Sequence, residues 1–300
     1  MKIILYIIAF FSLITLITTL LNLIKNPFIT RIIKNYGYTK EYAISNNIGG
    51  YEFIYYSVLV FILLFYFLIN FYSKINKKKL VVLTIIIILI PLLVVMSNYF
   101  IAFLILVISI FLVLIFKLSK KNTYLKLFIL FLSIILIYNF YTEKILDFFI
   151  DKTTGLNKTR LQELKDSYLE SKEFNLETNR WQLYKVSFNT FLETPLLGVI
   201  GKEKELIFGT TTSSGQHSHF LDSLVYLGLF LSLLQLYVIF RPFFIYIKDK
   251  TFNDLVFTFL CSFLIIFLFN NLTPSMSIPL FFIFPYLYDK MLEMINYEKD

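Results

Sequence analysis

Long runs of apolar residues, each about long enough to cross a lipid bilayer, recur along the chain. About 20 residues in a helix span the hydrocarbon core, and eight windows of roughly this kind are nearly free of charged residues. They lie at Ile3–Ile24, Phe53–Tyr72, Leu80–Met96, Tyr99–Phe116, Leu127–Tyr141, Phe220–Phe240, Leu255–Asn270 and Leu272–Tyr288. The pattern predicts an all-α integral membrane protein with a bundle of eight transmembrane helices, the first of them an uncleaved anchor.

The composition points to the same class of protein. Hydrophobic residues make up 58% of the chain and charged residues only 16%. Such a chain cannot cover its surface with polar groups in water, so lipid has to be part of its solvent. This excludes a soluble enzyme, a nucleic-acid-binding protein and a disordered scaffold. The single cysteine, Cys261, lies in an apolar run, so neither a disulfide framework nor a thiolate metal site is expected.

Basic residues in the short loops indicate which ends of the predicted helices face the cytoplasm. Clusters of Lys and Arg follow the second, fourth and sixth spans, whereas the turns after the third and seventh carry no charge. Because positively charged loops stay in the cytoplasm, we expect a multi-pass plasma-membrane protein with both termini cytoplasmic. The net charge of +8 is then an orientation signal, and no nucleic-acid partner is predicted.

One long polar segment, residues 142–218, separates the first five predicted spans (residues 1–141) from the last three (residues 219–300). It holds ten Lys or Arg and eleven Asp or Glu, and the predicted orientation places it outside the cytoplasm. Loops of this length in a compact protein are usually functional. Leu161, Leu164 and Tyr168 fall on one stripe, which predicts a first short helix over about Lys158–Lys172.

A second helix is predicted in this loop from Asn179 to shortly before Pro195. Its aromatic residues recur at spacings of three and four: Trp181, Tyr184, Phe188 and Phe191. We expect this stripe to pack on the top of the helix bundle or at the lipid interface. That packing would fix Arg180 in the first turn, where a guanidinium and a helix N-terminus together suit an oxyanion or a phosphate.

Both histidines of the chain, His217 and His219, lie at the start of the sixth predicted span, and Asp222 follows one turn later. An acid at that depth is costly unless it is paired or hydrated. One interpretation is an interfacial polar cap in which His219 and Asp222 pair. The other is a site where imidazole meets a substrate as base, acid or hydrogen-bond donor. Two histidines and one aspartate hold a cation poorly, so no metal site is predicted.

A helix that begins with arginine, a turn with proline and glycines, and a His-Ser-His-Phe-Leu-Asp stretch entering the next span follow one another here. The residues concerned are Arg180, Tyr184, Phe191, Pro195, Gly198, Gly201, His217–Asp222, Leu224 and Gly228. This ordered combination resembles the signature of the bacterial O-antigen ligases and polymerases. The serine after the first histidine and the aspartate after the leucine look closest to the capsule-type repeat-unit polymerases.

The resemblance implies a metal-independent membrane glycosyltransferase without a cofactor. Its substrate would be an oligosaccharide repeat unit linked to undecaprenyl diphosphate, joined to others to form capsule or O-antigen polysaccharide. A chain-length regulator and a flippase would be further partners. The diphosphate leaving group needs fixed cations, and Arg180 is the first candidate. His217 would orient or deprotonate the acceptor hydroxyl, or contact the diphosphate. The substrate-binding candidates are Arg160, His219, Asp222 and Tyr184.

Three other functions share part of this pattern. A ligase of the same family would move finished glycan to another acceptor, and the motif does not separate it from a polymerase. A transporter of lipid-linked oligosaccharides would show charges inside its spans and internal repeats, whereas only Asp222 is of that kind. A carrier-lipid glycosyltransferase with an acidic motif in its first outer loop would need a pair of acids, and Lys25–Gly50 holds only Glu41.

Overall fold

The computed structural model describes most of the chain as helix. The described residues are 2–30, 37–118, 142–153, 155, 158–159, 161–162, 165, 180–199, 218–248, 254–270, 272, 276 and 278–296. Within these ranges there are helices and turns and no strand, so the predicted all-α class is confirmed for them. The chain divides into two compact units. The first comprises Met1–Lys165, Phe257–Phe259 and Thr273–Asp300, and the second comprises Asp166–Val256 and Leu260–Leu272.

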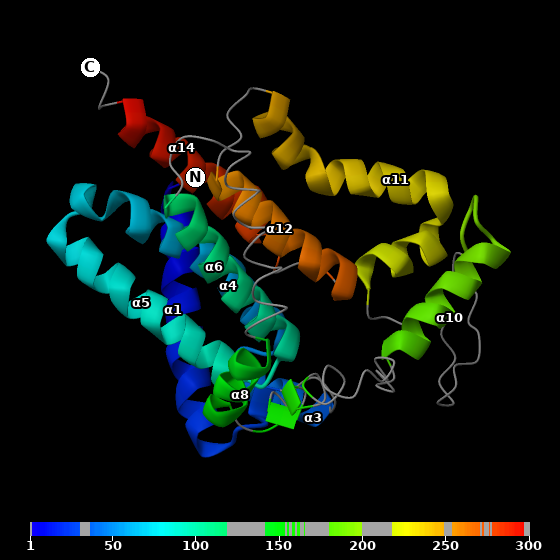
Figure 1. The fold of residues 1–300 in the computed structure, drawn as a ribbon, viewed down its shortest axis with the longest axis horizontal. Coiled ribbons are helices and arrows are strands. Elements are labelled where there is room, and N and C mark those ends of the chain that lie inside the picture. The colour runs from blue at the N-terminus through cyan, green and yellow to red at the C-terminus, as the bar shows by residue number, and fades with distance from the viewer. Residues whose placement is uncertain are drawn as a thin grey trace. The chain divides into compact units, whose positions relative to one another are not determined.

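The first four predicted spans are helices of the first unit, with ends within three residues of those predicted. They are α1 (Lys2–Lys25), α4 (Tyr51–Phe71), α5 (Lys77–Met96) and α6 (Phe100–Leu118). Helix α4 packs against both α5 and α6 (Figure 1), and its Ile54, Leu59 and Ile62 are fully buried. Helix α4 is therefore the core of this unit, with α5 and α6 on it, whereas α1 packs chiefly against α5.

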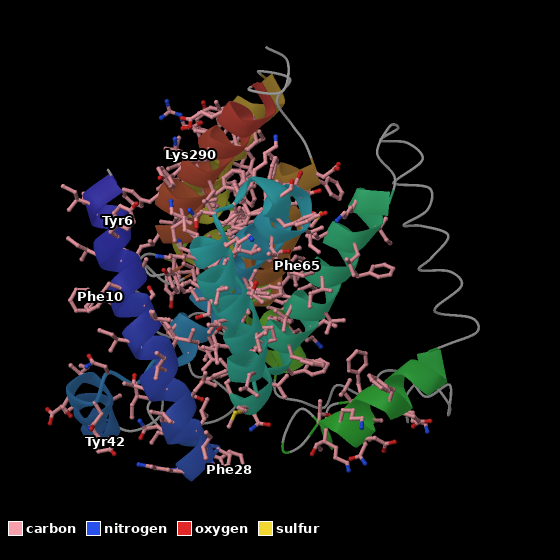
Figure 2. The ribbon with its side chains drawn as sticks, turned by 90° about the vertical axis from the view of Figure 1, so that its left-hand side faces the viewer. Tyr6, Phe10, Phe28, Tyr42, Phe65 and Lys290 are labelled. Atoms are coloured by element: carbon pink, nitrogen blue, oxygen red, sulfur yellow. The ribbon has the colours of Figure 1, made fainter. Side chains whose placement is uncertain are left out.

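Apolar side chains also cover the outside of the first unit. Tyr6 and Phe10 of α1 are 72% and 61% exposed and point away from the other helices (Figure 2). Val81, Ile85 and Ile88 of α5 are exposed in the same way. A contiguous apolar surface of this kind is stable against acyl chains and costly in water. By length and composition, α1, α4, α5 and α11 (His219–Lys248) are long and apolar enough to cross a membrane.

Two short helices of the first unit were not predicted, because neither contains an apolar run of membrane length. They are α3 (Gly37–Ser45) and α8 (Thr142–Lys152). Helix α8 is amphipathic: the Phe149 ring lies 5.6 Å from that of Phe103 on α6. On its polar side, Asp147 forms a salt bridge of 2.6 Å with Lys165.

Two predicted helices lie wholly or mostly outside the described residues. The fifth span, Leu127–Tyr141, lies wholly outside them, and the helix predicted over Lys158–Lys172 lies mostly outside them. Within the latter, the described residues 158–159, 161–162 and 165 are helical, as predicted.

The eighth predicted span is irregular, as its prolines indicate. Its described part consists of a π-helical turn, η3 (Pro279–Ile283), followed by α14 (Phe284–Asn296), which extends beyond the predicted end at Tyr288. Proline lacks the N–H of a regular helix, which explains the wide turn at Pro279. The seventh predicted span corresponds to α12 (Asp254–Phe269), and its Phe259 ring stacks on Phe284 with the centroids 4.8 Å apart.

Candidate functional site

The helix after the large loop bends back on itself. A single span over Phe220–Phe240 was predicted, but Gly228 within α11 is not helical (φ 67°, ψ −177°), and the helix turns sharply (Figure 1). The Ser232 hydroxyl donates to the Ser223 carbonyl at 2.7 Å. Residues this far apart in a straight helix would be separated by about 13 Å. The prediction of one uninterrupted span is therefore wrong: α11 consists of a first arm, His219–Leu227, and a second arm, Leu229–Lys248.

A turn from the large loop packs against this bend. Helix α10 (Arg180–Glu193) ends before Pro195, as predicted, and the turn that follows forms two main-chain hydrogen bonds with α11. The Val199 N–H donates to the Val225 carbonyl, and the Leu229 N–H donates to the Pro195 carbonyl, both at 2.8 Å. The end of α10 is thus joined through its main chain to the bend of α11.

Two glycines make this contact possible. A Cβ on Gly198 would lie 2.5 Å from the Gly228 nitrogen, and one on Gly228 would lie 2.3 Å from the Leu196 carbonyl oxygen. Both residues also have a positive φ, of 70° and 67°, which glycine adopts without steric cost. The sequence predicted a tight turn at Gly198 but not that its partner would be Gly228. Gly201 lies outside the described residues.

Further along, α10 and the first arm of α11 are joined by a buried hydrogen bond. The Ser187 hydroxyl donates to Oδ1 of Asp222 at 3.0 Å, and both side chains are buried. A buried carboxylate is tolerated only where it is hydrogen-bonded or paired. The structure thus shows a serine on another helix as a partner of Asp222, and the pairing with His219 that one sequence interpretation gave stays a prediction.

The beginnings of α10 and α11 meet the C-terminal end of α12. The Tyr184 hydroxyl donates to the Phe269 carbonyl at 3.3 Å, and the His219 N–H donates to the adjacent Asn270 carbonyl at 2.9 Å. Tyr184 lies one turn before Ser187 on α10, and His219 one turn before Asp222 on α11. The two helices therefore run side by side in the same direction, with the start of α11 level with the second turn of α10.

The imidazole of His219 lies between the two arms of α11 and α12. Its Nε2 is 3.2 Å from Nε2 of Gln235 on the second arm, and its ring centroid is 5.5 Å from that of Phe267. The side-chain amide of Gln235 is therefore within hydrogen-bonding distance of the imidazole. His219 is thus held by the fold that forms the site.

The stretch from α5 to the second arm of α11 matches a known family. Residues 85–236, just over half of the chain, match the family described as O-Antigen ligase. This chain belongs to the O-antigen ligase family. No curated protein and no solved structure matches it. The resemblance seen in the sequence is confirmed, and family membership makes this a membrane enzyme that handles lipid-linked glycans.

For Arg180 and His217, the two residues predicted to act in catalysis, the structure shows only the neighbouring main chain. Arg180 is the first residue of α10, one turn before Tyr184 on the same face. His217 precedes Ser218, whose hydroxyl accepts from the Leu221 N–H at 3.3 Å at the start of α11. The Arg180 side chain and all of His217 and Arg160 lie outside the described residues. Their roles stay predictions.

Two polar residues of the candidate site were not predicted, Ser187 and Gln235. Ser187 follows Arg180 by seven residues and Tyr184 by three, so helical spacing puts all three on one face. Gln235 is a polar residue within the apolar stretch after Gly228, and polar residues there are costly unless they have a role. The spacing of Ser187 and the polarity of Gln235 are both visible in the sequence. The bend at Gly228 is not, and without it Gln235 would be far from His219.

Within the part of the chain that the structure describes, no three His, Cys, Asp or Glu residues lie close enough together to hold a metal ion.

Removing the Ser187 hydroxyl should destabilise the second unit. In Ser187→Ala the buried Asp222 carboxylate loses this donor, which we expect to lower the free energy of unfolding by about 1–3 kcal/mol. Thermal unfolding in detergent micelles measures the effect. Ser223→Ala is the matched control, because that buried hydroxyl donates only within its own helix, to the His219 carbonyl. Equal losses in the two variants would contradict the importance of the bond between α10 and α11.

Proposed function

We propose that this O-antigen ligase family member is a polymerase. It joins oligosaccharide repeat units linked to undecaprenyl diphosphate into a surface polysaccharide, and undecaprenyl diphosphate is the leaving group. The proposal rests on the family match over residues 85–236 and on the sequence motif. That motif, with serine after His217 and Asp222 after the leucine, is most similar to the capsule-type polymerases.

The observation that supports this function most strongly is the meeting of α10 and α11 at their starts. Tyr184 and His219 bind adjacent carbonyls at Phe269 and Asn270. The first residue of α10 and the segment before α11 therefore belong to one region. Helix N-termini carry unpaired N–H groups and a partial positive charge, so two parallel helices whose first turns are neighbours favour an anion. The carbonyls at the C-terminal end of α12 oppose the positive potential of these two N-termini. The Tyr184 hydroxyl and the His219 N–H offset this in part, because they donate hydrogen bonds to two of those carbonyls.

In the proposed mechanism, Arg180 binds the diphosphate and stabilises the charge that grows on it. The acceptor hydroxyl oxygen attacks the anomeric carbon, a glycosidic bond forms, and the bond from that carbon to the diphosphate oxygen breaks. His217 orients this hydroxyl and takes its proton, as an imidazole can near neutral pH. A positioned cation is the main requirement, because the leaving group gains negative charge during the step.

Asp222, His219 and Tyr184 have a supporting part in this proposal. Each is held by a defined partner: Asp222 by Ser187, the His219 ring by Gln235, and the Tyr184 hydroxyl by the Phe269 carbonyl. Groups fixed in this way orient the substrate and the two catalytic residues without reorganising during the reaction. Arg160 in the outer loop is the second candidate for the diphosphate.

A ligase is the second candidate function, and the description of the matching family as O-Antigen ligase favours it. In a ligase the same leaving group departs, but finished glycan moves to a different acceptor. The products separate the two functions, because a polymerase lengthens the chain in steps of one repeat unit.

Purified protein in liposomes, supplied with the undecaprenyl-diphosphate-linked repeat unit of its own host, tests the proposal directly. We expect a ladder of products with one repeat unit per step on a gel. A single new product, formed only when a second acceptor is added, would identify a ligase. Movement of the intact lipid-linked unit across the bilayer without any ladder would identify a transporter and overturn both proposals.

A further inference from the structure

Helix α10 presents two different stripes on its exposed side. Lys185, Asn189 and Glu193 form a polar stripe, and Phe188, Leu192 and Leu196 form an apolar stripe that continues into the following turn. Within the helix, residues four apart lie along one line of the surface, and Leu196 follows in the turn after Pro195. The apolar side chains are 48%, 57% and 55% exposed. A helix with adjacent polar and apolar exposed lines suits a boundary between water and lipid.

The apolar stripe continues onto the bend of α11. Leu197 next to it is 74% exposed, and Leu229 and Phe230, which follow Gly228, are 39% and 65% exposed. The main-chain hydrogen bonds of Pro195 and Val199 join the two surfaces. Neither the turn at 194–199 nor the segment 223–240 contains a charged residue. The second arm itself exposes further apolar residues, Leu233, Leu234 and Val238, so the stripe is continuous with the surface of a candidate membrane span.

The length of the second arm indicates the depth of this surface. The charge-free part of the second arm, Leu229–Phe240, rises about 18 Å, more than half of the roughly 30 Å hydrocarbon core, and Arg241 follows it. In the predicted orientation Arg241 lies at the cytoplasmic boundary, so the bend lies in the outer half of the hydrocarbon core. The apolar stripe is joined to the bend and therefore lies at the level of the outer leaflet.

We propose that α10 is seated in the outer leaflet, with its apolar stripe against lipid acyl chains and its polar stripe facing water. The large loop is then anchored to the bilayer beside the candidate site, in addition to being joined to the helix bundle. This inference concerns lipid contact and does not depend on the polymerase activity.

Site-directed spin labelling tests this arrangement. Replacing Cys261, the single cysteine, by serine gives a cysteine-free background. Single cysteines then replace each member of the two stripes and carry a nitroxide in phosphatidylethanolamine–phosphatidylglycerol liposomes. We expect the ratio of oxygen to nickel-chelate accessibility to be severalfold higher at positions 188, 192 and 196 than at 185, 189 and 193. Leu197→Cys, in the turn, provides a further apolar position should one helix variant fail to fold.

Three results would overturn the proposal. High nickel accessibility at both stripes would place α10 wholly in water. Low accessibility to both reagents at the apolar stripe would mean that another part of this chain covers it. Spectral broadening at the apolar stripe that disappears on dilution with unlabelled protein would mean that a second copy covers it. None of these measurements involves product formation, so failure here is distinguishable from failure of the proposed function.

Discussion

Replacing Arg180 with alanine is expected to abolish the product ladder while leaving membrane insertion and abundance unchanged. The proposed mechanism makes this guanidinium the fixed cation that meets the diphosphate as its charge grows. Loss of one such stabilising group typically slows a reaction by about 10²–10³-fold, which reduces a ladder below detection. Arg180→Lys keeps the charge but loses the fork that binds two oxygens at once, so we expect it to retain a fraction of the activity. The ladder assay and an immunoblot of membranes measure the two quantities.

The control for this substitution lies on the same helix. Lys185 is a cation on the exposed polar stripe of α10, and Lys185→Ala should leave the ladder unchanged. His217→Ala should abolish the ladder as Arg180→Ala does, because the acceptor hydroxyl loses the group that orients it and takes its proton. If both Arg180→Ala and His217→Ala instead reduced abundance, their role would be structural and the proposed site would be wrong.

The four long helices of the first unit agree closely with those predicted from the sequence. In α1, α4, α5 and α6 the chain is apolar on all sides, so the length of each run is enough to locate its helix. Short amphipathic helices such as α8 give a weaker signal. Its apolar residues stand in groups of two or three between charged residues within eleven residues, so it contains no apolar run of membrane length.

The candidate site was predicted only in part, because it depends on a bend that leaves little trace in the sequence. Arg180, Tyr184, His219 and Asp222 were identified from their chemistry and their order, and the described ones among these side chains lie together as α10 and α11 run side by side. Their partners were not identified. Gln235 reaches His219 only because α11 reverses direction, and a glycine in an apolar helix is common enough that Gly228 alone does not predict a reversal.

Replacing Gly228 with alanine is expected to prevent the second unit from folding as described. The backbone of Gly228 occupies a region (φ 67°, ψ −177°) that is essentially open to glycine alone, which costs an alanine about 1–3 kcal/mol. Its Cβ would also lie 2.3 Å from the Leu196 carbonyl oxygen, a main-chain atom that can move away only by breaking the two hydrogen bonds of the turn. Each of these two hydrogen bonds contributes about 1 kcal/mol to stability.

The sum, about 3–5 kcal/mol, is a large part of the stability of a typical protein, so Gly228→Ala should accumulate poorly in membranes and unfold at a much lower temperature. Gly50→Ala is the matched control, because Gly50 has a φ of −87° that alanine adopts readily. The bend also brings Gln235 to His219 and places the apolar stripe at the lipid boundary. A Gly228→Ala protein that accumulates and unfolds like the parent would therefore remove the geometric basis of both the candidate site and the lipid contact.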